Sequence, residues 1–168
     1  MVETLLLWYH RFTEDPQKVR ARLNGRSVLV YEPPPDDTQD EDSERQLRTQ
    51  SGLSLPVIGG GDPTAVVIEK TAANAFKHRV TIGRTGNNDI VLDDTSVSRF
   101  HAWFEPQGEL WTLVDAGSRN GTWVSGKKLA AKTVISLTNG TPLRIGSLPL
   151  TYYTAQGFFD LLQRRATE

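Results

Sequence analysis

The chain has 168 residues, of which 38% are hydrophobic and 23% charged, and its formal net charge is −1. These values fit one globular domain with a core and short extensions, and a charge so close to zero argues against a non-specific nucleic-acid binder. The lack of cysteine excludes disulfides, thiolate metal sites and a cysteine nucleophile. Because His10, His78 and His101 are far apart in sequence, we expect no metal site and no cofactor.

The first region, residues 1–31, is predicted to be an N-terminal extension with one short helix and one strand. Asp15-Pro16 is a typical helix start and Asn24-Gly25 a typical stop, which predicts a helix from about Pro16 to Leu23. The apolar run Ser27–Tyr31 then predicts a strand. A piece of this size does not fold alone, so we expect it to pack on the main domain.

No targeting or membrane segment is predicted. The N-terminal apolar run Leu5–Tyr9 is too short for a signal-peptide core and follows an acid, Glu3. No stretch approaches the ~20 apolar residues that span a bilayer. We therefore expect a cytoplasmic protein that does not bind membranes.

The second region, residues 32–63, is predicted to be a flexible linker. It begins with Pro33–Pro35 and ends with Gly59–Gly61 before Asp62-Pro63, and residues 36–44 contain six acids in nine positions. Such a segment cannot bury enough apolar surface to offset the entropy lost on ordering. Residues 1–63 have seven basic and eleven acidic residues, net −4, whereas residues 64–168 have twelve and nine, net +3. This asymmetry permits electrostatic docking of the front on the back.

The third region, residues 64–154, is predicted to be an all-β domain. Short β-rich runs recur between polar turns, at 65–69, 79–82, 89–92, 101–105, 111–115, 122–124, 134–137, 143–145 and 150–154. Many short strands with polar turns indicate a sandwich or barrel. Residues 155–168 are predicted to form an amphipathic helix, with Phe158, Phe159, Leu161 and Leu162 on one side.

Three polar signatures lie at loop positions between these strands: Gly83-Arg84, Ser98–His101 and Ser118–Thr122. They supply guanidinium groups, hydroxyls and an amide, which is what a protein needs to hold a phosphate. A phosphothreonine carries about −1.5 to −2 charges and three acceptor oxygens at neutral pH. Because antiparallel strands return loops to one end of a sandwich, the three signatures can form one site.

With these motifs, residues 64–154 resemble a forkhead-associated (FHA) domain, a phosphothreonine-binding sandwich of two twisted sheets. The matching blocks, in order, are Gly83-Arg84, Asn88–Leu92, Val97–Ala102, Asp115–Val124 and Leu143–Gly146. Single blocks carry little weight, whereas five in order are specific. The resemblance covers a little over half of the chain. It departs from the family at Ser125-Gly126, where Asn-Gly is common, so the turn there is expected to differ.

The resemblance implies a role for each matched residue. Arg84 and Ser98 would contact the phosphate, Arg99 and Arg119 would flank it, and Asn120 would hydrogen-bond the peptide main chain. The set of implied ligand contacts is Arg84, Ser98, Arg99, Ser118, Arg119 and Asn120, and the implied support residues are Gly83, His101 and Gly121. The function implied is a non-catalytic phosphothreonine-binding adaptor in Ser/Thr kinase signalling, whose partners are a kinase or its substrates.

The residues also allow simpler interpretations. Arg84 alone is more often a surface ion-pair partner, Ser98 can cap the following strand, Asn120-Gly121 is first a hairpin turn, and Arg99 and Arg119 can be solvated. At the level of function, the alternative is a constitutive interaction module with an unused phosphate pocket. An enzyme is disfavoured because the β region lacks a nucleophile–base pair.

Thr38 is the one threonine of the acidic segment, and Asp40 and Glu41 follow it at two and three residues. An acid three residues after the phosphothreonine is a preference of some FHA domains. We therefore hypothesise that a kinase phosphorylates Thr38 and that the product docks on Arg84 and Ser98 of the same chain, where the tether raises its effective concentration. The alternative is that the acidic run only maintains solubility.

Overall fold

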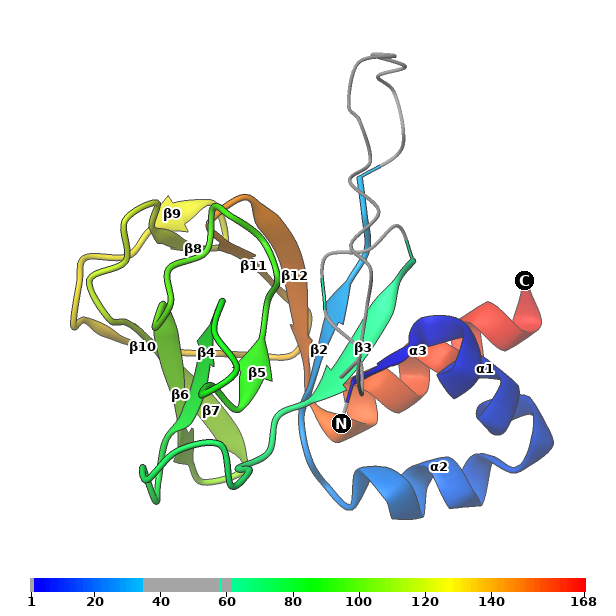
Figure 1. Cartoon of the computed structure of the whole chain (residues 1–168). Helices are drawn as coiled ribbons and strands as arrows, with labels where there is room; N and C mark the ends of the chain where they lie inside the picture. Colours follow the sequence, from blue (N-terminus) through cyan, green and yellow to red (C-terminus); the bar gives the residue numbers. More distant parts are fainter. Residues whose placement is uncertain (1, 35–57, 59–61) are drawn as a thin grey trace, which may run out of the picture.

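The computed structural model describes residues 2–34, 58 and 62–168, which form two β-sheets and three α-helices (Figure 1). Thr38 lies outside these residues. In sheet order, the larger sheet contains β1 (Val2–Thr4), β3 (Thr64–Val67), β2 (Val28–Tyr31), β12 (Leu148–Tyr153), β11 (Thr141–Ile145), β8 (Thr122–Val124) and β9 (Lys127–Lys128). The smaller sheet contains β10 (Val134–Ser136), β7 (Leu110–Asp115), β6 (Ala102–Gln107), β4 (Val80–Gly83) and β5 (Ile90–Val91).

The two sheets pack face to face around one hydrophobic core, which confirms the predicted β-sandwich. Phe104 and Leu113 from the smaller sheet and Leu143 and Leu150 from the larger sheet are all buried in it. Neighbouring strands are antiparallel, except that β4 and β5 run parallel. Alternating side chains along each strand point into this core or away from it, which is the pattern of a sandwich.

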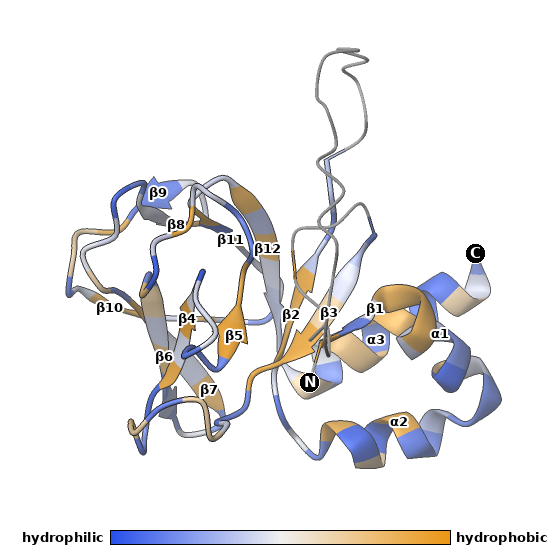
Figure 2. Ribbon diagram, in the orientation of Figure 1, coloured by the Kyte–Doolittle hydropathy of each residue, from blue (hydrophilic) through white to orange (hydrophobic). Residues whose placement is uncertain are grey.

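Strands β2 and β3 are buried on both faces. Leu29 and Val66 face the sandwich core, whereas Val28, Val30 and Val67 belong to a second apolar cluster formed with the helices. Figure 2 shows hydrophobic residues in β2, β3 and the adjoining α1. This double burial explains why the strand 28–31 has an unbroken apolar sequence instead of alternating polar and apolar residues.

The helices α1 (Leu5–Glu14), α2 (Pro16–Leu23) and α3 (Ala155–Thr167) lie together beside β2 and β3 (Figure 1). The second helix has the bounds expected from the sequence: Asp15 caps its start, and Asn24 ends it in a left-handed conformation. Its neighbour α1 was not predicted. None of the helices in the described part of the chain is both long and apolar enough to span a bilayer.

The first 31 residues therefore do more than pack against the sandwich. Strand β2 lies between β3 and β12, pairing with Val67 through its Val28 and with Leu150 through its Tyr31. The C-terminal helix α3 rests on the same cluster, where Phe158 meets Trp8 of α1 edge-on at 5.4 Å between ring centres. Both ends of the chain thus stabilise one side of the larger sheet.

Candidate functional site

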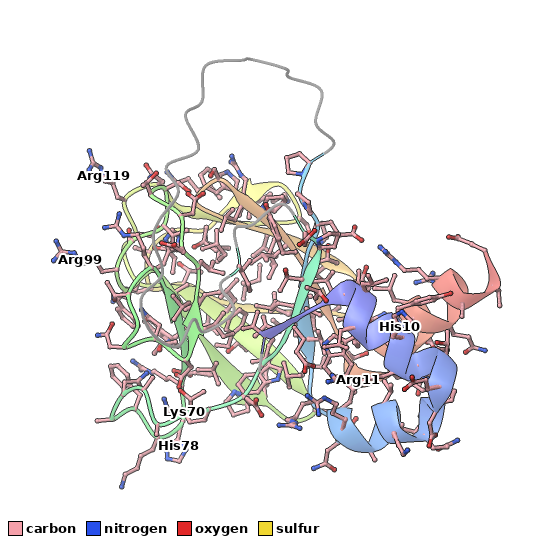
Figure 3. The ribbon with its side chains drawn as sticks, turned by 45° about the vertical axis from the view of Figure 1, so that its right-hand side comes forward. His10, Arg11, Lys70, His78, Arg99 and Arg119 are labelled. Carbon is pink, nitrogen blue, oxygen red and sulfur yellow. The ribbon has the colours of Figure 1, made fainter. Side chains whose placement is uncertain are left out.

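Five of the six predicted ligand residues, all except Ser118, come together at the loops that follow β4, precede β6 and join β7 to β8. They surround a shallow pocket of about 220 Å³ lined by Arg84, Thr95, Ser96, Val97, Ser98, Arg99, Arg119 and Asn120. Figure 3 shows Arg99 and Arg119 pointing outward from the same side of the sandwich. A larger cavity of about 530 Å³ lies beside the helices, next to Leu5 and Tyr9. The pocket of the candidate site is therefore distinguished by its hydrogen-bond donors and not by its size.

Gly83 allows two loops to approach closely at the floor of this site. A Cβ atom on Gly83 would lie 2.3 Å from the carbonyl oxygen of Arg99 and 2.8 Å from Nδ2 of Asn88. The buried Asn88 amide fills this junction and donates to that same Arg99 carbonyl at 2.6 Å. The next residue, Arg84, donates its backbone N–H to the Ser98 carbonyl at 3.0 Å. Glycine is therefore required here by space, which the sequence resemblance did not explain.

The basic groups that line the pocket are free to meet an anion. The side chains of Arg84, Arg99 and Arg119 make no ion pair with any residue that the structure describes. The Ser98 Oγ atom accepts a hydrogen bond from the backbone N–H of Arg119 at 3.0 Å. Since that bond uses a lone pair, the hydroxyl hydrogen stays available as a donor.

His101 is fully buried and both of its ring nitrogens are bonded to the backbone. Its Nδ1 accepts from the N–H of Ser98 at 3.0 Å, and its Nε2 lies 2.9 Å from the carbonyl oxygen of Gly121. The first bond requires an unprotonated Nδ1, so Nε2 carries the hydrogen and donates it. Burial lowers the pKa of His101, only partly offset by the Gly121 carbonyl and by Asp115. A neutral histidine thus joins two of the site loops.

The loop between β7 and β8 is built around the buried carboxylate of Asp115. It accepts from the N–H groups of Gly117 and Ser118 at 2.7 and 2.8 Å, and from the hydroxyls of Ser118 and Thr122, each at 2.6 Å. Burial alone would raise the pKa of Asp115, but these hydrogen bonds outweigh it and hold the pKa below its usual value. This role of Asp115 was not predicted from the sequence.

Ser118 differs from the other predicted ligand residues in where its hydroxyl points. Besides donating to Asp115, the hydroxyl oxygen accepts from the N–H of Gly121 at 3.0 Å. Ser118 does not line the pocket, and its hydrogen bonds lie within its own loop. Its hydrogen bonds are therefore those of a residue that shapes the loop.

Asn120 lies at the edge of the pocket, and only one of the two polar atoms of its side-chain amide forms a hydrogen bond. Its Nδ2 donates to the Ser96 carbonyl at 2.8 Å, whereas its Oδ1 has no partner among the described residues. The following Gly121 has a φ of +88°, a conformation that residues other than glycine rarely adopt.

The turn at Ser125-Gly126 has φ values of 50° and 80°. Ser125 therefore occupies a left-handed position that asparagine tolerates better than serine.

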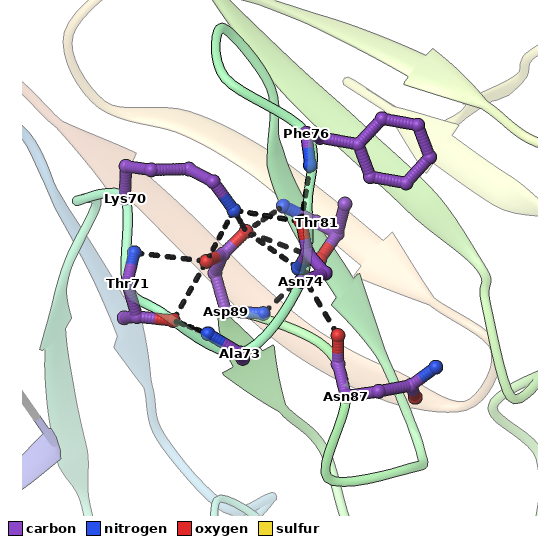
Figure 4. Close-up of polar contacts among 8 residues, drawn as sticks. All are labelled: Lys70, Thr71, Ala73, Asn74, Phe76, Thr81, Asn87 and Asp89. Atoms are coloured by element: carbon purple, nitrogen blue, oxygen red, sulfur yellow. Dashed lines mark hydrogen bonds and ion pairs between the residues drawn. The ribbon is translucent and has the colours of Figure 1, made fainter.

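A second polar cluster, centred on Asp89, anchors the loop that begins with Arg84 (Figure 4). The Asp89 side chain is 0% exposed and lies 2.8 Å from Nζ of Lys70 through both oxygens. It also accepts from the N–H groups of Thr71 and Thr81 at 2.9 and 2.8 Å. Burial opposes ionisation, but Lys70 and these donors prevail and lower the pKa of Asp89 strongly.

Asn74 ties the Asp89 cluster to the turn of the Arg84 loop, because its Nδ2 donates to the Asn87 carbonyl at 3.0 Å. Asn88 and Asp89 belong to one of the motifs of the resemblance, but no role was predicted for them from the sequence. An acidic residue directly before a short apolar strand is the local signal for Asp89, whereas its partner Lys70 lies nineteen residues earlier, between β3 and β4, and no local pattern links the two. No group of residues able to hold a metal ion occurs in the described part of the chain.

The chain is similar in sequence to known proteins. Residues 80–146 match the FHA domain family. The oxoglutarate dehydrogenase inhibitor of Corynebacterium jeikeium is 34% identical over 57% of this chain and 69% of its own length. The glycogen accumulation regulator GarA of Mycolicibacterium smegmatis is 40% identical over 61% of this chain and 67% of its own length.

A solved structure of Mycobacterium tuberculosis EmbR in complex with a low affinity phosphopeptide is also similar. Its identity is 33%, its TM-score is 0.42, and the match covers 45% of this chain and 20% of that one. The family match, residues 80–146, spans the loops described above. The chain belongs to the FHA domain family.

Proposed function

We propose that the protein is a non-catalytic adaptor that binds phosphothreonine-containing proteins in Ser/Thr kinase signalling. The observation that supports it best is the pocket lined by Arg84, Ser98 and Arg119, in which the guanidinium groups lack acidic partners among the described residues. An anionic group with several acceptor oxygens suits such a pocket, because charge-assisted hydrogen bonds are the strong ones.

In this proposal each lining residue has a separate role. The Arg84 guanidinium and the Ser98 hydroxyl bind phosphate oxygens, while Arg99 and Arg119 flank the phosphate. The free Oδ1 of Asn120 accepts a main-chain N–H of the peptide. We assign Ser118 to the loop, together with Gly83, His101 and Gly121, because its hydroxyl is already used there.

The names of the relatives favour a regulatory role. One is called an inhibitor of oxoglutarate dehydrogenase and another a glycogen accumulation regulator. By analogy, the bound partner of this protein would be a kinase, a kinase substrate or an enzyme under kinase control. The Thr38 hypothesis remains a prediction, tested by treating the protein with a Ser/Thr kinase and measuring whether modification at Thr38 blocks external phosphopeptides.

The proposed function is tested by calorimetric titration of the protein with a degenerate phosphothreonine peptide library. We expect binding by the phosphothreonine library, none by the unphosphorylated library, and a loss of at least tenfold in affinity for Arg84→Ala, since a charged hydrogen bond is removed. Arg164→Ala, on the exposed end of α3, serves as the control.

Two results would contradict the proposal. Equal binding of both libraries would favour the second candidate, a constitutive interaction module with an unused phosphate pocket. Unchanged binding by Arg84→Ala would show that the phosphate is held elsewhere on the molecule.

A further inference from the structure

Ile58 joins the edge of the smaller sheet, although it belongs to the region 32–63 that the sequence predicts to be a linker. It forms a parallel bridge with Leu92, which directly follows β5, and its carbonyl oxygen accepts a hydrogen bond from the N–H of Asp93 at 3.2 Å. Its side chain is 0% exposed and packs in the sandwich core. This residue therefore extends the edge of the sheet from which the chain runs to the pocket.

The residues bonded to Ile58 begin a loop that forms one wall of the pocket. We call residues 93–98 the pocket loop, and four of its residues line the pocket: Thr95, Ser96, Val97 and Ser98. The Asp94 carboxylate accepts from the N–H of Ser96 at 2.8 Å, and the Asp94 carbonyl oxygen accepts from the N–H of Val97 at 3.1 Å. Because these bonds make the loop a compact turn, a shift at its start moves the residues that line the pocket.

The pocket loop is also bonded to two of the residues proposed to bind the phosphopeptide. The Ser96 carbonyl accepts from Nδ2 of Asn120 at 2.8 Å, and the Ser98 carbonyl accepts from the N–H of Arg84 at 3.0 Å. These bonds attach the later part of the loop, whereas Ile58 attaches its start. The positions of the proposed phosphate and main-chain contacts thus depend on how firmly this loop is held.

We infer that Ile58 is a positioning residue for the phosphothreonine pocket: it packs in the core, accepts the Asp93 bond and so orders the pocket loop before a ligand binds. This inference rests on the proposed function. A loop that is already ordered in the free protein loses less conformational entropy on binding, which raises affinity. Since Ile58 precedes residues 80–146, this contribution to the site comes from outside the region that matches the family.

The test compares two alanine variants of the full chain that remove the same kind of side chain from the same core. Ile58→Ala takes away the group that fixes the start of the pocket loop. Ile68→Ala is the matched control, because Ile68 is 1% exposed in the same core cluster and its N–H donates to the Ser27 carbonyl at 2.8 Å. Urea unfolding should show both variants folded and destabilised, since both substitutions leave a cavity.

Calorimetric titration with the phosphothreonine peptide library should separate the two variants. We expect Ile58→Ala to bind about threefold to tenfold more weakly than the wild type, because binding must then order the loop, whereas Ile68→Ala should stay within about twofold. The conservative variant Ile58→Val keeps a branched apolar side chain in the core and should restore the affinity. A residue that acted only through global stability would not produce this difference between the two positions.

Hydrogen exchange of the wild-type protein tests the same link without a variant. Exchange of the Asp93 N–H reports on its bond to Ile58. Because coupling between two sites is reciprocal, a saturating phosphothreonine peptide should slow exchange at Asp93 and in the segment that contains Ile58. Exchange that the peptide leaves unchanged would contradict the inference, even if Ile58→Ala failed to fold.

The outcomes distinguish this inference from the proposed function. Equal affinities of the wild type and Ile58→Ala, or equal losses of affinity in the two alanine variants, would overturn the positioning role alone. A wild-type protein that binds no phosphothreonine peptide would overturn both.

Discussion

The backbone N–H of Ser98 donates a hydrogen bond to Nδ1 of His101 at 3.0 Å, which couples a residue of the pocket to a buried ring. Through its other nitrogen the same ring reaches the Gly121 carbonyl at 2.9 Å. The arrangement of the two loops thus depends on a neutral imidazole, since a protonated Nδ1 could not accept the Ser98 bond.

Stability is therefore expected to depend on pH through His101. Burial lowers the pKa of His101 in the folded protein, so the unfolded chain takes up a proton at a higher pH than the native protein does. The contribution is present above about pH 6.5, and the free energy of unfolding falls as the pH drops below that value. Urea unfolding between pH 7.5 and pH 5 measures it.

The variant His101→Gln is the matched control for this pH effect, because glutamine does not titrate. It should have a shallower slope over the same range. The buried carboxylates do not interfere there: their pKa values are lowered, so their contribution is lost only as the pH falls below about 4. An equal slope in the variant would exclude His101 as the source.

Ser118→Ala and Arg119→Ala should affect different properties, although the two residues are adjacent: the first should lower stability and the second should weaken phosphopeptide binding. Ser118→Ala removes one donor to Asp115 and the acceptor of the Gly121 N–H, so we expect a loss of about 1–3 kcal/mol in the free energy of unfolding. Arg119→Ala removes an exposed side chain, with about 0.5 kcal/mol or less of destabilisation, and weakens phosphopeptide binding. Urea unfolding and peptide titration of both variants test this. An Arg119→Ala variant that is less stable than Ser118→Ala would contradict the prediction, and so would one that binds phosphopeptides as the wild type does.

Asp89→Asn should destabilise the domain by about 2–3 kcal/mol, because it leaves the Lys70 ammonium group facing a neutral amide in a largely buried cluster. Phosphopeptide affinity should fall as well, since this cluster anchors the Arg84 loop through Asn74. Asp160→Asn, on the exposed side of α3, is the control. A stability equal to that of the control would mean that the loop is anchored in another way.

Deletion of residues 1–31 should prevent the sandwich from folding, even though the family match begins at residue 80. The deletion removes β2 from between β3 and β12 and exposes apolar residues such as Val67 and Phe158. Exposed edges and apolar faces promote aggregation. Circular dichroism and sedimentation of the shortened chain check this, and a cooperative, monomeric unfolding transition would refute it.

Local signals in the sequence were sufficient for much of this fold. The cap at Asp15-Pro16 gave the bounds of α2, and turn residues separated nearly all strands of the sandwich. Helix α1 was not predicted, although Leu5, Trp8 and Phe12 have helical spacing and Thr4 caps its start, because the continuous apolar run Leu5–Tyr9 obscures the amphipathic pattern. The place of β2 inside the sheet depends on pairing between residues far apart in sequence, which no local pattern encodes.

The candidate site was predictable as a set of residue types but not in its internal bonding. Order and spacing indicated Arg84, Ser98 and Asn120, which the structure brings to one pocket. The inward direction of the Ser118 hydroxyl and the burial of Asp89 depend on how the loops close. A sequence records the donors and acceptors of a loop but not which of them are used up within it.

Tyr31 at the end of β2 lies opposite Thr64 at the start of β3. The chain therefore leaves the larger sheet and re-enters it at facing positions, as in a hairpin with a long connection. Because the entropy of closing a long loop grows only with the logarithm of its length, doubling the length of the connection costs about 0.6 kcal/mol. The length of the connection before Ile58, which is buried in the core and pairs with Leu92, can therefore change without shifting the strand register, since β2 also remains bonded to β12.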